Sequence, residues 1–257
     1  MITPQMQIHY DRFEHQKWTP FDSETIVETP VSLTVNGEAW VTFMCTPTDL
    51  EAMAIGFLFN EGVIESMSDV ADVRLCEHGD NLDVWLNRAT QQPRSWRRTS
   101  GCTGGVTAVD LLSLPEIKFE PAQPKLEPKD VGLLIDLLLE SQDLYRETGG
   151  VHTSMLTDGQ RVVMAAEDIG RHNTLDKIAG LCMQRDAWPD TRIVLTTGRI
   201  SSEMLQKAAR LRAPILMSRT SPSSLSIQMA QRYGITLIGY ARRQRFNVYS
   251  NPQRVGL

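Results

Sequence analysis

In the first half of the chain, apolar residues alternate with polar ones on both sides of Asn36-Gly37, over residues 31–45. Alternation with a period of two is typical of half-buried strands, and Asn-Gly between two such runs is the strongest short signal of a hairpin. This stretch therefore predicts two paired strands. Residues 1–23, in contrast, show no periodicity and are expected to form a tail or arm.

A helix is expected directly after this hairpin. Thr48-Asp49 opens a run over 49–62 that predicts an amphipathic helix, and Gly62 stands just past its end. A capping residue before such a run and a glycine after it are the usual start and stop signals. Two more strands are expected near 70–76 and 82–86, so the first half predicts a small α+β unit.

The second half has a more regular pattern. A long helix is expected from Pro128, a favoured first helical position, to about Arg146, because its apolar residues keep helical spacing. An Asp-Gly turn then joins two strands, and the next helix is expected to have Asn173 as its N-cap. Three strands alternate with two helices in the remainder, at residues 192–197, 201–211, 213–218, 222–233 and 235–240.

This order of elements predicts an α/β fold. Short connections and right-handed crossovers make the last three strands parallel, with helices on both faces and the hairpin as an antiparallel edge. Such a three-layer domain resembles the cytidine-deaminase-like fold. Three prolines in 119–129 indicate a linker, so we expect a smaller α+β N-terminal domain at 24–118 and the α/β domain at 126–257. Deaminases carry Cys-x-x-Cys at a helix start, which is absent here, so no zinc site is expected.

Composition places the chain among ordinary globular proteins. It has 257 residues, of which 41% are hydrophobic and 22% charged, and four cysteines that form no close pair. Sparse cysteines favour reduced thiols in a cytoplasmic protein, and the N-terminus carries no pattern of a secretory signal. No apolar run approaches the length of a membrane span, about 20 residues.

Charge is unevenly distributed along the chain. From Thr191 to Leu257 there are eleven Lys or Arg and one acid, Glu203, although the net charge of the whole chain is −5. A basic terminal part on an acidic protein suggests a surface for an anionic partner, either a nucleic acid or a phosphorylated small molecule. Solvated helix faces would explain some of these arginines equally well.

The segments that follow the strands of the second half share one chemistry. They read EDIGRHN (167–173), TGRISS (197–202), SRTSPSS (218–224) and YARRQRF (240–246). Ligands bind outside the carboxyl ends of parallel strands, helix N-termini favour anions, and arginine suits bidentate contact with phosphate. Simple capping would explain one such loop, whereas four loops at one sheet edge favour an anion site of nucleotide size. The candidate binding residues are Arg171, His172, Asn173, Thr197, Gly198, Arg199, Ser201, Ser202, Ser218, Tyr240, Ala241, Arg242, Arg243, Gln244, Arg245 and Phe246.

One cysteine differs from the other three. Cys102 lies in SGCTGG with Arg94, Arg97 and Arg98 upstream, whereas Cys45 and Cys182 fall within regular elements. Nearby cations lower the pKa of a thiol, and flanking glycines leave the sulfur accessible. The local pattern fits either a nucleophilic thiolate or an incidental surface cysteine.

Several long motifs resemble those of the FdhD/NarQ family of formate dehydrogenase accessory proteins. They include EDIGRHNTLDKIAG, TGRISSEMLQKAA, APILMSRTSPSSLSIQMA and ITLIGYARRQRFNVYS, and the resemblance extends over roughly residues 24–250. It implies a sulfur carrier that receives sulfur from a cysteine desulfurase as a persulfide on Cys102. The sulfur would pass to molybdenum (or tungsten) bis(molybdopterin guanine dinucleotide), bound as a client, which is then inserted into formate dehydrogenase. The resemblance also suggests a homodimer.

The chain departs from the family pattern at one position. The family commonly has Cys-x-x-Cys in the loop of Cys102, and here Gly105 stands in the second place. A chaperone that binds the cofactor without sulfur transfer is therefore the alternative function. Binding of single-stranded nucleic acid is a third hypothesis, disfavoured because few aromatic residues are available for stacking. We expect neither nucleic acid nor membrane as a partner.

Overall fold

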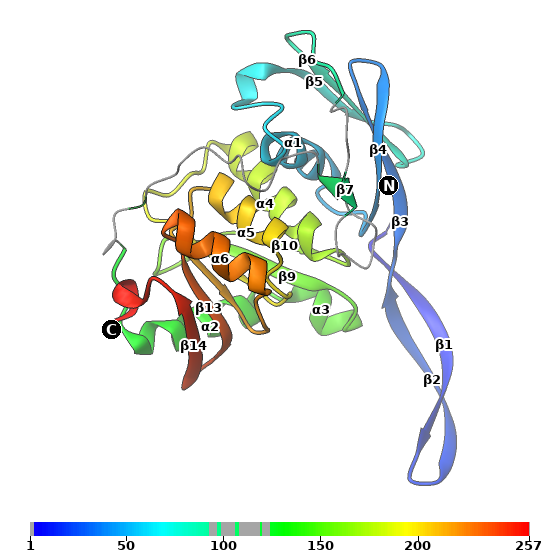
Figure 1. The fold of residues 1–257 in the computed structure, drawn as a ribbon. Coiled ribbons are helices and arrows are strands. Elements are labelled where there is room, and N and C mark those ends of the chain that lie inside the picture. The colour runs from blue at the N-terminus through cyan, green and yellow to red at the C-terminus, as the bar shows by residue number, and fades with distance from the viewer. Residues whose placement is uncertain (1–2, 93–96, 99–105, 108–118, 120–123, 257) are drawn as a thin grey trace.

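The larger part of the protein is built on a six-stranded sheet. A computed structural model describes residues 3–92, 97–98, 106–107, 119 and 124–256 (Figure 1). The strand order is β10-β9-β11-β12-β13-β14, in which β11, β12 and β13 are parallel and the other neighbours antiparallel. The bounds are β9 His152–Thr157, β10 Val162–Asp168, β11 Ile193–Thr196, β12 Ile215–Ser218, β13 Thr236–Arg242 and β14 Arg245–Ser250. The expected parallel strands and antiparallel edge hairpin are confirmed.

Helices cover both faces of this sheet, as expected from the sequence. The helix α2 (Pro128–Glu140) packs Leu134 and Leu138 onto one face, in a core shared with Ile215 and Ile238. On the other face lie α4 (Arg171–Arg185), α5 (Ser202–Arg210) and α6 (Ser224–Tyr233), which bury a second apolar core. The α/β class is therefore confirmed, whereas the likeness to deaminases stays a prediction. No helix in the described part of the chain is long and apolar enough to cross a membrane.

A smaller sheet lies beside this body. Its order is β4-β3-β6-β5, with β3 Thr29–Val35, β4 Glu38–Cys45, β5 Val70–Leu75 and β6 Asn81–Leu86. The predicted Asn36-Gly37 turn joins β3 to β4, and both residues have positive φ (49° and 85°). Short 3₁₀ turns lie at Met67–Asp69 and Pro252–Val255, and a two-residue ladder pairs β7 (Arg97–Arg98) with β8 (Val106–Thr107).

The helix α1 (Leu50–Asn60) joins the small sheet to the body. It is enclosed on almost all sides, so the expectation of an amphipathic helix was wrong. Gly56 and Gly180 explain this, because a Cβ on either would lie 1.8 Å from a backbone oxygen of the facing helix. The backbones of α1 and α4 therefore touch, and Glu51 is the one exposed residue of α1. The domain boundaries near 118 and 126 stay a prediction, since 108–118 and 120–123 lie outside the described residues.

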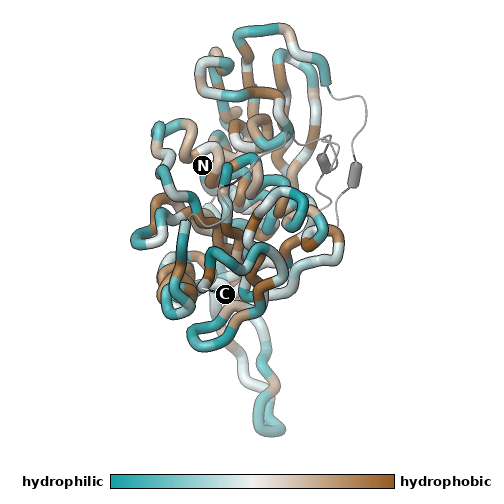
Figure 2. The backbone as a smooth tube through the Cα atoms, turned by 60° about the vertical axis from the view of Figure 1, so that its left-hand side comes forward, coloured by the Kyte–Doolittle hydropathy of each residue, from teal (hydrophilic) through white to brown (hydrophobic). Residues whose placement is uncertain are grey.

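The N-terminal segment forms strands that the sequence does not predict. β1 (Gln5–Glu14) and β2 (Lys17–Ile26) pair over ten positions and extend away from the body (Figure 1). The ribbon is mostly hydrophilic in Figure 2, because it is exposed on both faces and needs no apolar alternation. Its turn places His15 and Gln16 at positive φ (50° and 62°) without the usual Asn or Gly.

The long helix expected over 128–146 is two helices. α2 ends at Glu140, and α3 (Asp143–Thr148) begins after Gln142, whose side-chain amide donates to Thr153 Oγ1 at 3.1 Å. The carboxylate of Glu167 accepts the backbone N–H groups of Leu144 and Tyr145. A carboxylate of β10 thus binds the first N–H groups of α3. This contact joins residues distant in sequence, so apolar periodicity cannot reveal it.

Two helix starts also differ from the expectation. Asn173 was predicted as an N-cap, but α4 begins at Arg171 with Gly170 as its cap. The helix expected over 222–233 begins at Ser224, and it is capped by Ser223, whose side chain accepts from the backbone N–H of Ser226. In both cases the loop residues before the helix are held by tertiary contacts.

Candidate functional site

A cavity of about 390 Å³ opens at the edge of the large sheet where β11, β12 and β13 end. The expected convergence of strand-end segments is real here, since Thr197, Arg219 and Arg242 all line this cavity. The opposite wall comes from the end of α3 and the start of β9, which sequence reasoning missed. The lining residues are Gln142, Tyr145, Gly149, Gly150, Val151, His152, Ile169, Thr197, Arg219, Thr220 and Arg242.

One feature of the sequence could have predicted the wall that was missed. β9 runs antiparallel to β11, so its first residue, His152, lies at the same edge as the carboxyl end of β11. Gly149 and Gly150 precede β9, and Gly149 has a positive φ of 68°. A glycine pair before an antiparallel neighbour of the parallel strands thus indicated a second wall of the site.

His152 and Thr197 face the cavity as a polar pair. The Thr197 hydroxyl accepts the backbone N–H of Thr153 at 3.0 Å and lies 3.4 Å from His152 Nδ1. Burial lowers the pKa of His152, and the neighbouring Arg171 and Arg199 lower it further, whereas Asp168 opposes them. His152 is therefore neutral near pH 7, and the positive charge of the site comes from arginines.

Two arginines define the charge of the cavity wall. Arg242 Nη1 donates to the carbonyl oxygens of Arg219 (2.6 Å) and Ala241 (2.8 Å), which fixes its guanidinium at the end of β13. Arg219 Nε is buried and has no hydrogen-bond partner among the described residues. Leaving a buried N–H unpaired costs about 1–3 kcal/mol, so a ligand oxygen at this position would satisfy it.

Arg171 and His172 lie beneath the cavity and are not in its lining. Arg171 is 6% exposed and packs under Gly198, where a Cβ would lie 2.8 Å from the Arg171 Cβ. His172 Nε2 lies 3.1 Å from Ser201 Oγ and 3.2 Å from Glu203 Oε2, and burial holds the pKa of His172 well below its usual value. Both side chains therefore support the loops from inside.

Three other predicted polar residues, Ser218, Ser201 and Asn173, hold the strand-end loops in place. Ser218 Oγ donates to the carbonyl of Gly198 at 2.6 Å, and Ser201 caps α5 by accepting the N–H of Met204. Asn173 Nδ2 donates to Asp168 and to the carbonyl of Met44. Ser202 is the first residue of α5, and Arg199 lies three residues before it. The simple capping explanation applies to Ser201, and the binding roles of all five residues stay predictions.

The segment 240–246 forms a hairpin between β13 and β14, whereas a strand-end loop was expected. Tyr240 turns the chain with a φ of 52°, and Arg243 pairs with Asp136 of α2 at 2.6 Å, on the other face of the sheet. Gln244 and Arg245 are exposed, and Phe246 packs against the core beneath α2. Of the arginines in this segment, Arg242 alone lines the cavity, and the binding roles of all three stay predictions.

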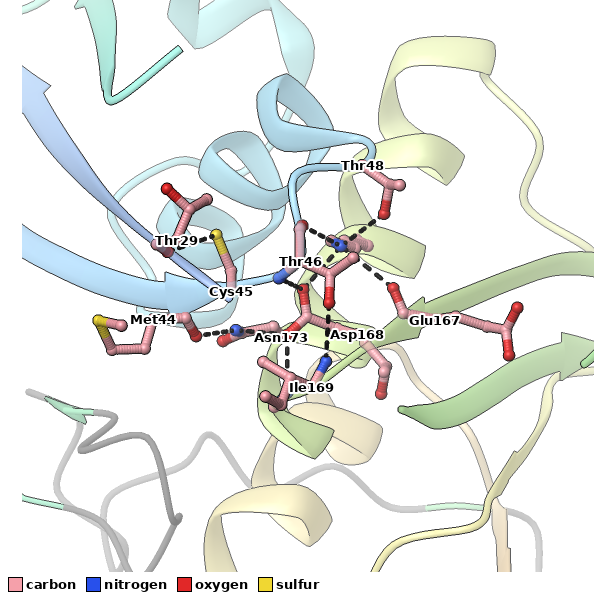
Figure 3. Close-up of polar contacts among 12 residues, drawn as sticks. Thr29, Met44, Cys45, Thr46, Thr48, Glu167, Asp168, Ile169 and Asn173 are labelled. Atoms are coloured by element: carbon pink, nitrogen blue, oxygen red, sulfur yellow. Dashed lines mark hydrogen bonds and ion pairs between the residues drawn. The ribbon is translucent and has the colours of Figure 1, made fainter. Parts of the chain in front are cut away.

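A buried ion pair joins the small sheet to the body near this site (Figure 3). Lys177 Nζ lies 2.7 Å from Asp168 Oδ2, and both side chains are fully buried. Lys177 also donates to Thr46 O, Thr48 Oγ1 and Glu167 O, while Asp168 accepts the backbone N–H of Thr46. Sequence reasoning did not single out either residue, because nothing local marks a lysine as buried. The pair fixes the first residues of α4 and the segment after β4.

The described cysteines are poorly suited to nucleophilic chemistry. Burial raises the pKa of Cys45 and of Cys182 to about 12. Cys76 is half-buried, and its thiol donates to Asp80 Oδ1 at 3.0 Å. Cys102 and Gly105 lie outside the described residues, within the segment 99–105 that connects the paired strands β7 and β8.

The chain is similar to known proteins along nearly its whole length. The model of the FdhD/NarQ family matches residues 26–256. The chain is 32% identical over 248 residues to the "Sulfur carrier protein FdhD" of two Staphylococcus aureus strains, MRSA252 and Newman, covering 95% of this chain and 94% of each relative. The crystal structure of a putative formate dehydrogenase accessory protein from Desulfotalea psychrophila has a TM-score of 0.81 at 30% identity, over 98% of this chain and 99% of that one.

Proposed function

The chain belongs to the FdhD/NarQ family, and we propose that it carries sulfur for a formate dehydrogenase as a persulfide on Cys102. The observation that carries this proposal is the state of the other thiols. Two are buried with pKa values raised to about 12, and the third donates a hydrogen bond to a carboxylate. Because the thiolate is the nucleophile, Cys102, with its arginine-rich and glycine-rich sequence, fits a sulfur acceptor better than these three.

The loading step is a thiol–persulfide exchange. The Cys102 thiolate attacks the terminal sulfur of the persulfide on a cysteine desulfurase, which forms the new S–S bond. The S–S bond of the donor breaks at the same time, and the donor cysteine leaves as a thiolate. The acceptor is molybdenum bis(molybdopterin guanine dinucleotide), which we treat as a substrate on its way to formate dehydrogenase.

The cavity at the sheet edge is the proposed site for the guanine nucleotide end of that substrate. Its volume suits part of a nucleotide, and its lining includes the guanidinium groups of Arg219 and Arg242 and the hydroxyl of Thr197. Arginine binds phosphate oxygens with two N–H groups at once, so one or two phosphates would satisfy both side chains.

We expect Arg219→Gln and Arg242→Gln each to weaken the binding of guanosine diphosphate at least tenfold. A charge-assisted hydrogen bond contributes about 1.5–3 kcal/mol, which corresponds to a factor of ten or more in affinity. Isothermal titration with guanosine diphosphate measures this effect. Arg243→Gln is the matched control, because Arg243 pairs with Asp136 and does not line the cavity. Equal loss in all three variants would show a general effect of positive charge and would contradict the assignment of the nucleotide to this cavity.

A cofactor chaperone without sulfur transfer is the alternative function, and Gly105 is the observation that favours it. If Cys102 does carry sulfur, no neighbouring thiol in its own loop can discharge it. We therefore expect the Cys102 persulfide to outlast that of Gly105→Cys in the absence of added thiol, since exchange requires an accessible thiolate.

This difference in lifetime is followed by mass spectrometry of the loaded protein. In Gly105→Cys the lost sulfur should leave a disulfide between residues 102 and 105, and Gly105→Ser is the matched control. Equal lifetimes in all three proteins would contradict the single-thiol carrier. Failure of every variant to load sulfur would favour the chaperone.

A further inference from the structure

The smaller unit of the protein is strongly acidic. Residues 24–92 contain twelve Asp or Glu and two bases, Arg74 and Arg88. Both bases are already engaged, because Arg74 pairs with Asp72 and Arg88 donates to the carbonyl of Val63. The surface of this unit therefore carries a large excess of negative charge that its own residues do not neutralise.

Two cavities lie next to Asp49, between this unit and the neighbouring parts of the chain. One, of about 580 Å³, lies between the start of α1, the end of β5 and the C-terminal part of α4. The other, of about 830 Å³, lies between the base of the β1–β2 ribbon, the start of α1, α3 and β10. Both are lined by Asp49, so they flank the segment Pro47–Asp49, and we call them together the acidic groove.

The acidic groove is one-sided in charge and has an apolar lining. Among the described residues that line it, seven are Asp or Glu and one, Arg185, is basic. Asp49, Glu51, Glu77 and Glu147 form no ion pair with any described residue, and the last three side chains are exposed. Leu50, Leu75 and Leu181 form part of the wall of the smaller cavity.

The carboxylates of the acidic groove are spread out and not gathered into one cluster. In the part of the chain that the structure describes, no three His, Cys, Asp or Glu side chains are arranged to hold a metal. The carboxylates are spread along two cavities, so they complement lysine or arginine side chains that are spread along another polypeptide segment. Apolar walls between them would accept aliphatic side chains or the stems of lysine and arginine.

We propose that the acidic groove docks a segment of another protein in which Lys or Arg residues are interspersed with apolar residues. Complementary charge steers the encounter, while burial of the apolar residues against the leucines holds the segment. A second copy of this chain is a poorer fit. Several arginines of the basic part, residues 191–257, already donate hydrogen bonds to backbone carbonyls of their own chain. They include Arg192, Arg210 and Arg254. This inference does not depend on sulfur transfer by Cys102.

The test uses a fluorescein-labelled peptide of alternating leucine and lysine and measures anisotropy with the full-length protein. We expect saturable binding that weakens with added salt, because exposed charges are screened beyond about 8 Å at physiological ionic strength. The variant Glu51→Lys/Glu77→Lys/Glu147→Lys should weaken binding at least tenfold. The neutralising variant Glu51→Gln/Glu77→Gln/Glu147→Gln should weaken it less, and it provides a folded protein if charge reversal disturbs α1.

The matched control is Glu38→Lys/Glu140→Lys/Asp190→Lys. It makes the same change in net charge at three exposed acids outside the acidic groove, and binding should stay within about twofold of the wild type. Equal loss in the control would show general attraction to an acidic protein and would overturn the proposal. A peptide of alternating serine and lysine that binds as tightly as the leucine peptide would overturn the apolar part of it.

Two further outcomes separate the other occupants. Displacement of the peptide by millimolar Mg²⁺ or Ca²⁺, beyond that produced by sodium chloride of equal ionic strength, would assign the carboxylates to a metal and contradict the proposal. The second outcome comes from sedimentation velocity of the variant Glu51→Lys/Glu77→Lys/Glu147→Lys. If the charge reversals, but not the control substitutions, dissociate an oligomer of this chain, the occupant is a second copy and the proposal is wrong.

Discussion

Replacing Lys177 by methionine is expected to lower the free energy of unfolding by about 3–5 kcal/mol, because removal of one partner leaves the other charge buried and unpaired. Lys177 and Asp168 are both fully buried and 2.7 Å apart. Methionine keeps the length of the side chain but none of its four polar contacts, to Asp168, Thr46, Thr48 and Glu167. Urea unfolding followed by circular dichroism measures the change.

Two companion variants make this result interpretable. Lys17→Met removes an exposed lysine from the β1–β2 ribbon and should change the free energy of unfolding by less than about 0.5 kcal/mol. Lys177→Met/Asp168→Asn also removes the unpaired carboxylate that Lys177→Met leaves buried, and it should recover part of the lost free energy of unfolding. A loss below about 1 kcal/mol for Lys177→Met would show that the buried pair does not hold the small sheet to the body.

The second large effect concerns activity. Replacing Cys102 by serine is expected to abolish sulfur loading and to leave the formate dehydrogenase of the cell inactive, because a hydroxyl cannot form a persulfide. The variant should fold normally, since it exchanges one small side chain for another of similar size. Formate-dependent dye reduction in extracts of a complemented deletion strain measures the effect.

Cys76→Ser is the matched control for this substitution. Its thiol is half-buried and bonded to Asp80, so the variant should retain formate dehydrogenase activity within about twofold. Loss of activity in Cys76→Ser with full activity in Cys102→Ser would assign the carrier role to Cys76 and contradict the account. Activity in both variants would favour the chaperone.

Much of the fold could be predicted from the sequence, because the signals that set it are local. The Asn36-Gly37 turn, the glycine at the end of α6 and the alternation of strands with helices each depend on a few neighbouring residues. The break between α2 and α3 depends instead on Glu167, which is distant in sequence and caps α3. The β1–β2 ribbon escaped prediction because neither of its faces is buried.

The candidate site was predicted in position but only in part by residue. Strand ends fix the edge at which ligands bind, so Thr197 and Arg242 could be named in advance. His152 and the glycine pair before it were missed, because their contribution depends on the antiparallel pairing of β9 with β11. Arg171 and His172 carry suitable chemistry for a ligand, but they are buried near Gly198 and Ser201 and are not in the lining of the cavity, so their binding roles stay predictions. The sequence shows which residues have side chains that could bind a ligand, whereas burial decides which of these side chains can reach it.

The central claim is that Cys102 carries sulfur, and peptide mapping after loading tests it most directly. The purified protein is incubated with a cysteine desulfurase and cysteine, its thiols are blocked, and the peptides are analysed by mass spectrometry. The account predicts one added sulfur atom, located on Cys102, that is removed by a reducing thiol. Sulfur on Cys45, Cys76 or Cys182, or no sulfur on any cysteine, would contradict it.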